Sequence, residues 1–568
     1  MMRMAKVAVL LEKTAAEKRW KFGLNVFEKY IEEILAHAGI SYEMLESLED
    51  GVPEDADIVL DVLSQEKSSL EALLAFAEKG GKVISYAGLN AAAEQFGCRE
   101  IASNGAGYAK LPAQLGDARP MRYLQARPWV IDDESRAELH AAGSLHATQP
   151  NGEQTAPAFI RIQVGSGSID RWAVNMLYTI VGMQQGTMPV FEDGIPAADG
   201  TGSVNDSILK ADDRVEMDWT WDRLTTPETG TPYFAHPYAD LWREALITHL
   251  MKSVVDMGLT LPFIGYWPEG VSRVAMISHD SDTNKDEHAE ATLEVLEECG
   301  IRSTWCMIEP GYSTYIYDRV RAAGHELAFH YNALDAQNGK WDEAEFVRQL
   351  NWFKQAADVE EVTSNKNHYT RYEGWGELFQ WCEKYGIAAD QTRGPSKKGN
   401  IGFLFGTCHP YFPIAWADER NRMYDVVEIG FLTQDLDHRI LADSSVIVPF
   451  LEGVARVEGV AHFLFHQIHI KEQPKVTEAI KKVVRLAKEA GFVFWTSKEI
   501  NDWTRARRTI RIEGIDAAGH VETTAGAELE NVVAWVPAPS AGEGTAMKFG
   551  VHCKKQVIST KKKVSEQS

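Results

Sequence analysis

Cysteine is scarce in this sequence: the 568 residues include six, and no two of them form a CxxC pair. This spacing argues against a zinc ribbon or a thioredoxin-type site. A long chain with so few cysteines is typical of a reducing compartment, where disulfides do not persist. The apolar run from Val7 to Leu11 is shorter than the core of a secretory signal and ends in charged residues. We therefore expect a cytoplasmic protein whose first element is a β-strand.

Long apolar runs and a basic excess are also missing. No run reaches the roughly 18 residues that a membrane-spanning helix needs. Lys and Arg number 58 against 82 Asp and Glu, which gives a net charge of −24. Because phosphate backbones are bound by basic surfaces, this charge disfavours a nucleic-acid partner. The hydrophobic fraction of 45% and the charged fraction of 25% are ordinary for globular domains, and at about 150 residues per domain the length predicts three or four.

Strand and helix patterns alternate through the first hundred residues. Apolar runs predict strands at 6–11, 56–63 and 82–88, and a helix ends at Gly39, where a C-cap glycine belongs. This alternation predicts an α/β domain with a parallel, doubly wound sheet of the flavodoxin-like type. Within residues 1–260, which we assign to this domain, two further strands are expected at 156–180, a long loop at 186–235 and a helix at 240–258.

The alternation resumes from residue 272 to about 505, after a proline-containing linker at 261–270. Repeated strand–helix units over roughly 230 residues predict a TIM-like barrel, which we place at 261–505 and expect to have fewer than eight strands. Short β-like runs predict a small β appendage at 506–553. The basic, polar tail at 554–568 is predicted to be disordered.

Reactive side chains gather at three predicted strand ends of the barrel. The segment SHDSD (278–282) follows an apolar strand with two carboxylates, of which one can bind a metal while the other takes a proton. His330 ends the strand ELAFH. His466 and His469 follow the strand AHFLF, where imidazoles can act as ligands or as a general acid. Each feature alone is equally compatible with a turn, a cap or a structural role.

A fourth group of polar and aromatic residues, NKNHYTRYEGWG (365–376), places His368 beside Arg371. An arginine here can fix a carboxylate, and Tyr372 or Trp375 can stack on a sugar ring. Plain surface packing explains the same pattern.

Taken in order, these groups resemble the motifs of the polysaccharide deacetylase family, the NodB-homology domain of carbohydrate esterase family four. The resemblance covers residues 270–500. SHDSD resembles the first motif and STWCM (303–307) the strand after it. The later motifs resemble, in turn, GHELAFH (324–330), the region of Arg371, YDVVEIG (424–430) and His466.

The resemblance implies a (β/α)7-type deacetylase barrel that hydrolyses a carbon–nitrogen (amide) bond of an N-acetylated sugar or a related compound. Asp280 would be the catalytic base, Asp282 and His330 metal ligands, and His466 the general acid that protonates the leaving amine. Arg371 would belong to the catalytic group. The implied cofactor is a divalent metal, with zinc expected and cobalt or manganese as alternatives.

The sequence departs from the family at Leu334, four residues after His330, where the family has a second histidine ligand. Leucine cannot bind a metal, so the site is weaker, absent or rebuilt. Asn332, Asp335 and His368 are the candidates for the missing ligand, since three protein ligands and a water are usual for a catalytic zinc.

Two other functions fit the same residues. A non-catalytic carbohydrate-binding or scaffold protein would explain Leu334, although it has no physical need to keep four such groups at strand ends. A carboxylate-dependent glycosidase needs two acids about 5–9 Å apart. Asp280 and Asp282 lie on one loop, so Glu428 is the other candidate acid. The expected partner is a carbohydrate or a small amide in either enzyme.

The N-terminal domain more weakly resembles the class I glutamine-amidotransferase-like fold, which carries a nucleophilic cysteine on a tight turn after a central strand. Here the strand at 82–88 leads into Leu89 and Asn90, and Cys98 lies further on. We therefore expect no amidotransferase activity from this domain, and instead a scaffold role that includes homo-oligomer formation.

Overall fold

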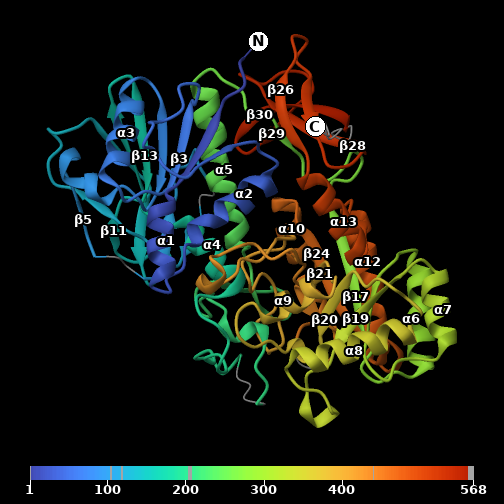
Figure 1. The fold of residues 1–568 in the computed structure, drawn as a ribbon. Coiled ribbons are helices and arrows are strands. Elements are labelled where there is room, and N and C mark those ends of the chain that lie inside the picture. Colours follow the sequence, from blue (N-terminus) through green and yellow to red (C-terminus); the bar gives the residue numbers. More distant parts are fainter. Residues whose placement is uncertain (1, 103–104, 117–118, 203–206, 439–440, 561–568) are drawn as a thin grey trace.

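The computed structural model describes residues 2–102, 105–116, 119–202, 207–438 and 441–560. These residues form a mixed α/β protein with three parts (Figure 1). An N-terminal sheet lies beside a second, parallel sheet with helices around it, and a smaller antiparallel sheet from the C-terminal residues packs against both. Among the described residues, none of the helices combines the length and the apolar character that crossing a bilayer requires.

The N-terminal sheet has the strand order β2-β1-β3-β4-β13-β12-β9. Its first five strands run parallel, and β12 and β9 are antiparallel additions at one edge. The order 2-1-3-4 is that of flavodoxin-like doubly wound sheets. The strands are β1 (Val7–Leu11), β2 (Glu43–Leu45), β3 (Ile58–Leu63), β4 (Lys82–Tyr86), β9 (Leu139–Ala142), β12 (Phe159–Val164) and β13 (Gly167–Trp172).

The inner strands of this sheet are buried along their whole length, as expected for parallel strands that helices cover on both faces. The helices are α1 (Lys13–Lys21), η1 (Phe27–Tyr30), α2 (Ile31–Ala38), α3 (Lys67–Glu78), η2 (Asn90–Phe96), α4 (Met176–Gln185) and α5 (Tyr238–Asp256). Gly39 caps α2 with φ 70°, and a Cβ there would lie 2.6 Å from the carbonyl oxygen of Ile264. Glycine therefore allows α2 to contact the smaller sheet closely.

Short strands and loops extend the N-terminal part: β5 (Cys98–Glu100), β6 (Gly107–Lys110), β7 (Met121–Tyr123), β8 (Trp129–Ile131), β10 (Ser144–Ala147), β11 (Gln154–Ala156), η3 (Ala211–Arg214), β14 (Arg223–Thr225) and β15 (Pro232–Phe234). The long loop expected at 186–235 thus contains three short elements. It reaches the second sheet, because Lys210 pairs with Arg371 and Val190 with Gly374 as isolated β-bridges.

The second sheet has the order β22-β21-β20-β19-β18-β17-β24-β23, and β25 pairs with the start of β17. All of its pairings are parallel. The strands are β17 (Val274–Asp280), β18 (Thr304–Met307), β19 (Glu326–Tyr331), β20 (Ser364–Asn367), β21 (Ala389–Asp390), β22 (Val427–Glu428), β23 (Thr433–Gln434), β24 (Val460–His466) and β25 (Val493–Phe494).

One chain segment, 427–434, connects the two edges of this sheet. Its start, β22, pairs with β21 and its end, β23, pairs with β24. The surrounding helices are α6 (Asp286–Cys299), α7 (Thr314–Ala322), η4 (Asp335–Gln337), α8 (Glu343–Ala356), η5 (His368–Thr370), α9 (Glu377–Lys384), η6 (Ala417–Glu419), η7 (Ser444–Val446), α10 (Ile447–Val457), α11 (Gln467–Glu472), α12 (Pro474–Glu489) and α13 (Ser497–Arg508).

The C-terminal sheet has the order β16-β28-β30-β29, with β16 (Phe263–Ile264), β28 (Leu529–Pro537), β29 (Thr545–Lys548) and β30 (Val551–Thr560), and a hairpin of β26 (Arg511–Ile515) and β27 (Val521–Thr524) lies beside it. The expected boundary at residue 553 is wrong, because 554–560 continue β30 and pair with β28. The lysines of this strand led us to expect a disordered tail. In the structure, Lys555 pairs with Glu269, and Ile558 lies opposite Val532. Residues 561–568 of the predicted tail lie outside the described residues.

A buried ion cluster ties α5 to the N-terminal sheet. Asp170 on β13 is fully buried and accepts hydrogen bonds from Arg161 at 2.7 Å and Lys82 at 3.0 Å. His249 of α5 donates from Nε2 to the same carboxylate at 2.8 Å, since its Nδ1 accepts from Trp172. Burial alone would raise the pKa of Asp170, but Arg161 and His249 hold it far below the usual value.

Asp170→Asn is expected to lower the free energy of unfolding by about 3–5 kcal/mol, because it leaves buried cations without a counter-ion. A depressed carboxyl pKa stabilises the fold above the unfolded-state pKa of about 3.9, and this stabilisation is lost as the pH falls below it. The difference between wild type and variant should therefore shrink in acid. Urea unfolding at several pH values measures it. Asp318→Asn, at an exposed ion pair, is the control and should change stability by less than about 0.5 kcal/mol. An equal loss in both variants would contradict the role of the cluster.

Candidate metal and catalytic site

Five side chains from separate elements meet at the carboxyl-terminal edge of the barrel strands. Asp280 ends β17, His330 lies near the end of β19, and His466 ends β24. Asp282 follows β17 by two residues, and His368 begins η5 directly after β20. Parallel strands end at one edge of a sheet, and in barrels this edge carries the active site. The register places Asp280 directly opposite His466.

Asp282, His330 and His368 form a group whose ligand atoms all lie within 4.8 Å of one another. Nε2 of His330 lies 3.5 Å from Oδ1 of Asp282, and Nε2 of His368 lies 3.6 Å from its Oδ2. The Nδ1 atoms of both imidazoles already have polar partners. Nδ1 of His330 donates to the carbonyl oxygen of Lys366 at 2.9 Å, and Nδ1 of His368 contacts Oδ1 of Asn332 at 3.3 Å. Both rings therefore direct an Nε2 lone pair at the same point.

The residues of this group fit a divalent metal. Nε2 of His330 and Oδ1 of Asp282 are buried, and neither has a hydrogen-bond partner among the described residues. Burial alone would raise the pKa of Asp282, but His466, His330 and His368 lower it well below the usual value, so the carboxylate is ionised. Two imidazoles and one carboxylate are a ligand set that catalytic zinc uses, with a position left for water.

Asp280 faces this group from the side. Its Oδ2 lies 3.8 Å from Nε2 of His330 and 3.9 Å from Nε2 of His466. Its Oδ1 lies 3.3 Å from Nζ of Lys366, a fully buried lysine on β20. The same ammonium donates to Oγ of Ser278 at 2.6 Å. Lys366 therefore supplies the positive charge next to the carboxylate that could act as a base.

His466 lies between two sets of carboxylates. Its Nδ1 contacts Oδ2 of Asp435 at 2.5 Å, and its Nε2 lies 3.6 Å from Oδ2 of Asp282. Nδ1 of His469 binds the same Asp435 oxygen at 2.9 Å. Burial alone would lower the pKa of His466, but Asp435, Asp282 and Asp280 raise it to about 10. The imidazole is thus held as a cation that can give up a proton at Nε2.

Some residues suggested by the sequence lie elsewhere. Asp335 is exposed on η4 and is not part of the metal-binding group. Asn332 contacts Nδ1 of His368 and accepts a hydrogen bond from the backbone N–H of Leu334. It therefore positions the imidazole of His368 and is not itself a member of the metal-binding group. Leu334 is buried and offers no ligand atom, whereas the imidazole of His368 lies within reach of Asp282 and His330 and could be the third ligand.

Arg371 does not contact Asp280 among the described residues. Its guanidinium donates to the carbonyl oxygen of Ala333 at 2.7 Å and pairs with Glu373. Tyr372 and Trp375 are almost completely buried, so neither can offer its ring to a sugar. These residues hold the turn after β20 in place.

Glu428, the candidate second acid of a glycosidase, is fully buried on β22. Burial and the neighbouring Asp390 raise its pKa well above the usual value, and its Oε1 accepts from the backbone N–H of Arg393. Glu428 is thus engaged with the chain around β21 rather than with Asp280, and the arrangement does not favour a pair of carboxylates across a glycosidic bond.

Sequence reasoning missed Lys366 and Asp435. The register places Lys366 opposite His330, and this pairing cannot be read from the sequence, where the only signal was a lysine within the polar segment NKNH. Asp435 follows the two-residue strand β23, which is too short for its pattern to be recognised.

No protein-family model matches the chain, and no curated protein matches it. Similar solved structures include a polysaccharide deacetylase from Mycobacterium smegmatis, with 15% identity over 43% of this chain and 94% of that chain and a TM-score of 0.32. A polysaccharide deacetylase involved in O-antigen biosynthesis from Bordetella bronchiseptica shares 15% identity over 39% and 93%, with a TM-score of 0.28. A β-galactosidase from Bacillus circulans sp. alkalophilus shares 13% identity over 32% and 30%, with a TM-score of 0.25. Identities and TM-scores this low establish no function for this chain.

The purified protein is expected to bind about one equivalent of a divalent metal, and Asp282→Ala, His330→Ala and His368→Ala should each remove it. Asn332→Ala should weaken binding by about 10–100-fold, because it frees the ring of His368. Elemental analysis and competition with a chromophoric chelator measure these effects. Asp335→Ala is the matched control and should bind metal like the wild type. Full metal content in His368→Ala would refute the three-residue site.

Proposed function

We propose that the chain is a metal-dependent hydrolase of amide bonds that deacetylates an N-acetylated sugar or a related carbohydrate. The observation that carries this proposal is the placement of Asp280 and His466 on either side of the Asp282–His330–His368 group, with Nε2 of His466 3.9 Å from Oδ2 of Asp280. A carboxylate and a protonated imidazole that flank one metal position are the acid–base pair that amide hydrolysis requires.

The side chains divide the reaction between them. When bound by Asp282, His330 and His368, the metal would make a water more acidic and polarise the amide carbonyl. Asp280 accepts a proton from the water that attacks the acyl carbon. His466 donates its Nε2 proton to the amide nitrogen as the carbon–nitrogen bond breaks. The products are acetic acid, which keeps the second proton of the water until it ionises in solvent, and a free amine. The proton on Asp280 then passes to His466, which returns both side chains to their starting forms.

Two buried contacts prepare these groups for their roles. Lys366 contacts Oδ1 of Asp280 while His466 faces Oδ2, and this contact fixes the orientation of the carboxylate. Asp435 holds Nδ1 of His466, so that Nε2 is the nitrogen directed at the reaction centre.

A sugar substrate is supported by an aromatic side chain at the rim of the site. Tyr369 follows His368 and is 51% exposed, with its ring centroid 4.6 Å from the imidazole. An exposed ring beside a metal ligand offers an apolar face to a pyranose ring. The N-terminal part contributes Lys210, whose Nζ lies 5.8 Å from the same ring, so both parts of the chain border the site.

Asp280→Asn and His466→Ala are expected to lower kcat by at least about 10²–10⁴-fold, because each removes a proton-transfer group. Both should keep their metal. Acetate release from N-acetylglucosamine oligomers by the zinc-, cobalt- and manganese-loaded enzyme is the measurement, and Glu428→Gln is the control that tests the glycosidase alternative. If the metal-loaded wild type releases no acetate, or if Asp280→Asn is fully active, the proposal fails.

Lys366→Met is expected to lower kcat strongly with little change in KM, because the lysine acts on the catalytic carboxylate and not on the substrate. Lys366→Arg should restore part of the activity, since a second cation can take its place. Steady-state kinetics with a measurement of metal content separates this effect from a loss of the metal. An activity loss that follows the metal content in both variants would show that the lysine has only a structural role.

A further inference from the structure

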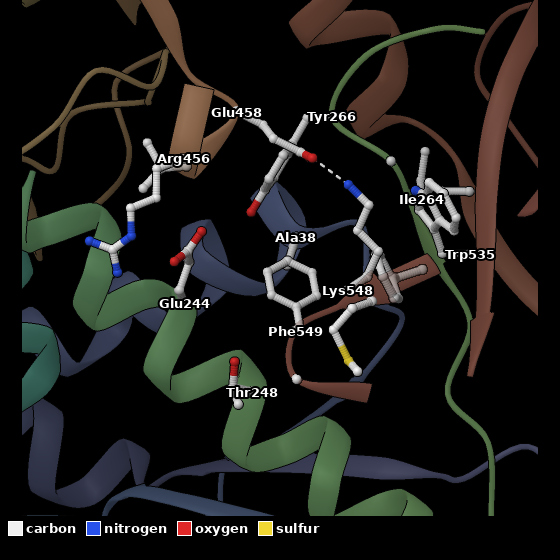
Figure 2. A pocket seen from close by; sticks show the side chains of 15 residues that line it. Ala38, Glu244, Thr248, Ile264, Tyr266, Arg456, Glu458, Trp535, Lys548 and Phe549 are labelled. Carbon is white, nitrogen blue, oxygen red and sulfur yellow. Dashed lines mark hydrogen bonds and ion pairs between the residues drawn. The ribbon is translucent and has the colours of Figure 1, made fainter. Parts of the chain in front are cut away.

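A cavity of about 220 Å³ lies where the three parts of the protein meet. Helix α5 and the end of α2 form one wall, and the end of α10 forms the second. The third wall is the smaller sheet, with β16, β28 and the turn between β29 and β30 (Figure 2). The residues that line it include none of the metal-binding or catalytic group, so this is a separate site.

Several polar groups point into the cavity without a partner. The Glu244 carboxyl and the Thr248 hydroxyl come from successive turns of α5, and the Tyr266 hydroxyl is directed at the same space (Figure 2). Trp535 adds its indole N–H from β28. None of these four side chains has a hydrogen bond within the described part of the chain. Polar groups that converge on a cavity in this way are typical of a ligand site.

Aromatic rings line the space around these groups. Tyr266, Trp535 and Phe549 belong to the lining, and the rings of Tyr266 and Phe549 lie edge to face at 6.3 Å. Phe549 has a left-handed backbone with φ 44°, an unfavourable conformation for a side chain of this size. The turn thus keeps an aromatic ring at the cavity at some cost in backbone energy.

Two acids and two bases line the cavity. Glu458 pairs with Lys548, whose ammonium also lies 5.1 Å over the ring of Trp535. Glu244 faces Arg456 across α5 and α10 (Figure 2). Burial raises the pKa of Glu244 to about 8, although Arg456 opposes the shift. The Glu458–Lys548 pair is neutral as a whole, and a carboxyl that carries its proton leaves no free anion for an amine to bind, so the lining favours a neutral ligand over an amine.

We propose that this cavity binds one neutral sugar residue, whose apolar face lies against the aromatic rings while its hydroxyls bind Glu244, Thr248 and Trp535. A protonated carboxyl, a hydroxyl and an indole N–H supply both donors and acceptors, which sugar hydroxyls need. The volume corresponds to about seven water molecules, which leaves room for one ring but not for an oligosaccharide. A ligand here touches α5, α10 and β28 at once and so stabilises the contact between the three parts of the chain.

The test uses the full-length protein with D-glucose, N-acetyl-D-glucosamine and D-glucosamine as probes, measured by saturation-transfer NMR and calorimetry. Glu244→Leu and Trp535→Phe are each expected to weaken binding of the two neutral sugars by about tenfold, since each removes a hydrogen-bonding group. Glu244→Gln keeps a neutral donor and acceptor and should stay within about threefold of the wild type. The matched control is Trp221→Phe, at an exposed tryptophan outside the cavity.

An Asp282→Ala, His330→Ala double variant separates this site from the catalytic one. Neutral sugar binding that persists in the double variant and is lost in Glu244→Leu supports the cavity, whether or not the barrel proves to be a deacetylase. The proposal is overturned if no neutral sugar binds, if D-glucosamine alone binds, or if Glu244→Leu and Trp535→Phe bind like the wild type. Thermal unfolding of each variant shows that an affinity loss does not come from a failure to fold.

Discussion

The parallel register between β17 and β24 sets Asp280 opposite His466, and the chemistry of the barrel depends on this pairing. Because all neighbouring strands are parallel, their carboxyl ends reach the same edge, where Asp282 and His330 also arrive. The segment 427–434, which connects the two edges of the sheet, has a second effect. The segment ends beside β24 and places Asp435 next to His466. The segment that connects the two edges of the sheet therefore also orients the imidazole of His466.

Buried charge then determines what each side chain can do. The imidazoles around Asp282 stabilise its ionised carboxylate at the edge of the parallel sheet. The backbone carbonyl of Lys366 fixes the tautomer of His330, while its ammonium faces Asp280. One residue of β20 therefore contacts both His330 and Asp280. A change there would alter two functions at once, which ties the geometry of the site to the register of a single strand.

Sequence patterns identified the reactive groups that end long strands, since apolar runs followed by Asp or His are local signals. Asp280, His330 and His466 are of this kind. Lys366 and Asp435 were not recognised because their roles depend on which strands become neighbours, and this information is spread over more than a hundred residues of the chain. The same limit explains the wrong end of the small sheet. The lysines of β30 led us to expect a disordered tail, because the partner strand β28 could not be foreseen. The strands β1, β3 and β4, by contrast, were predicted from their apolar sequences alone.

Leu334 offers no ligand atom, and the turn after β20 brings His368 to Asp282 and His330. That turn is strained: Thr370, a β-branched residue, has φ 54°. Such a backbone persists only where surrounding contacts hold it, and Arg371 provides one by donating to the carbonyl oxygen of Ala333. Arg371, expected at the catalytic group, therefore holds the turn that carries His368. The cation beside Asp280 is instead the fully buried Lys366 of β20. The end of β20 and the turn after it thus place both His368 and Lys366 beside the two aspartates.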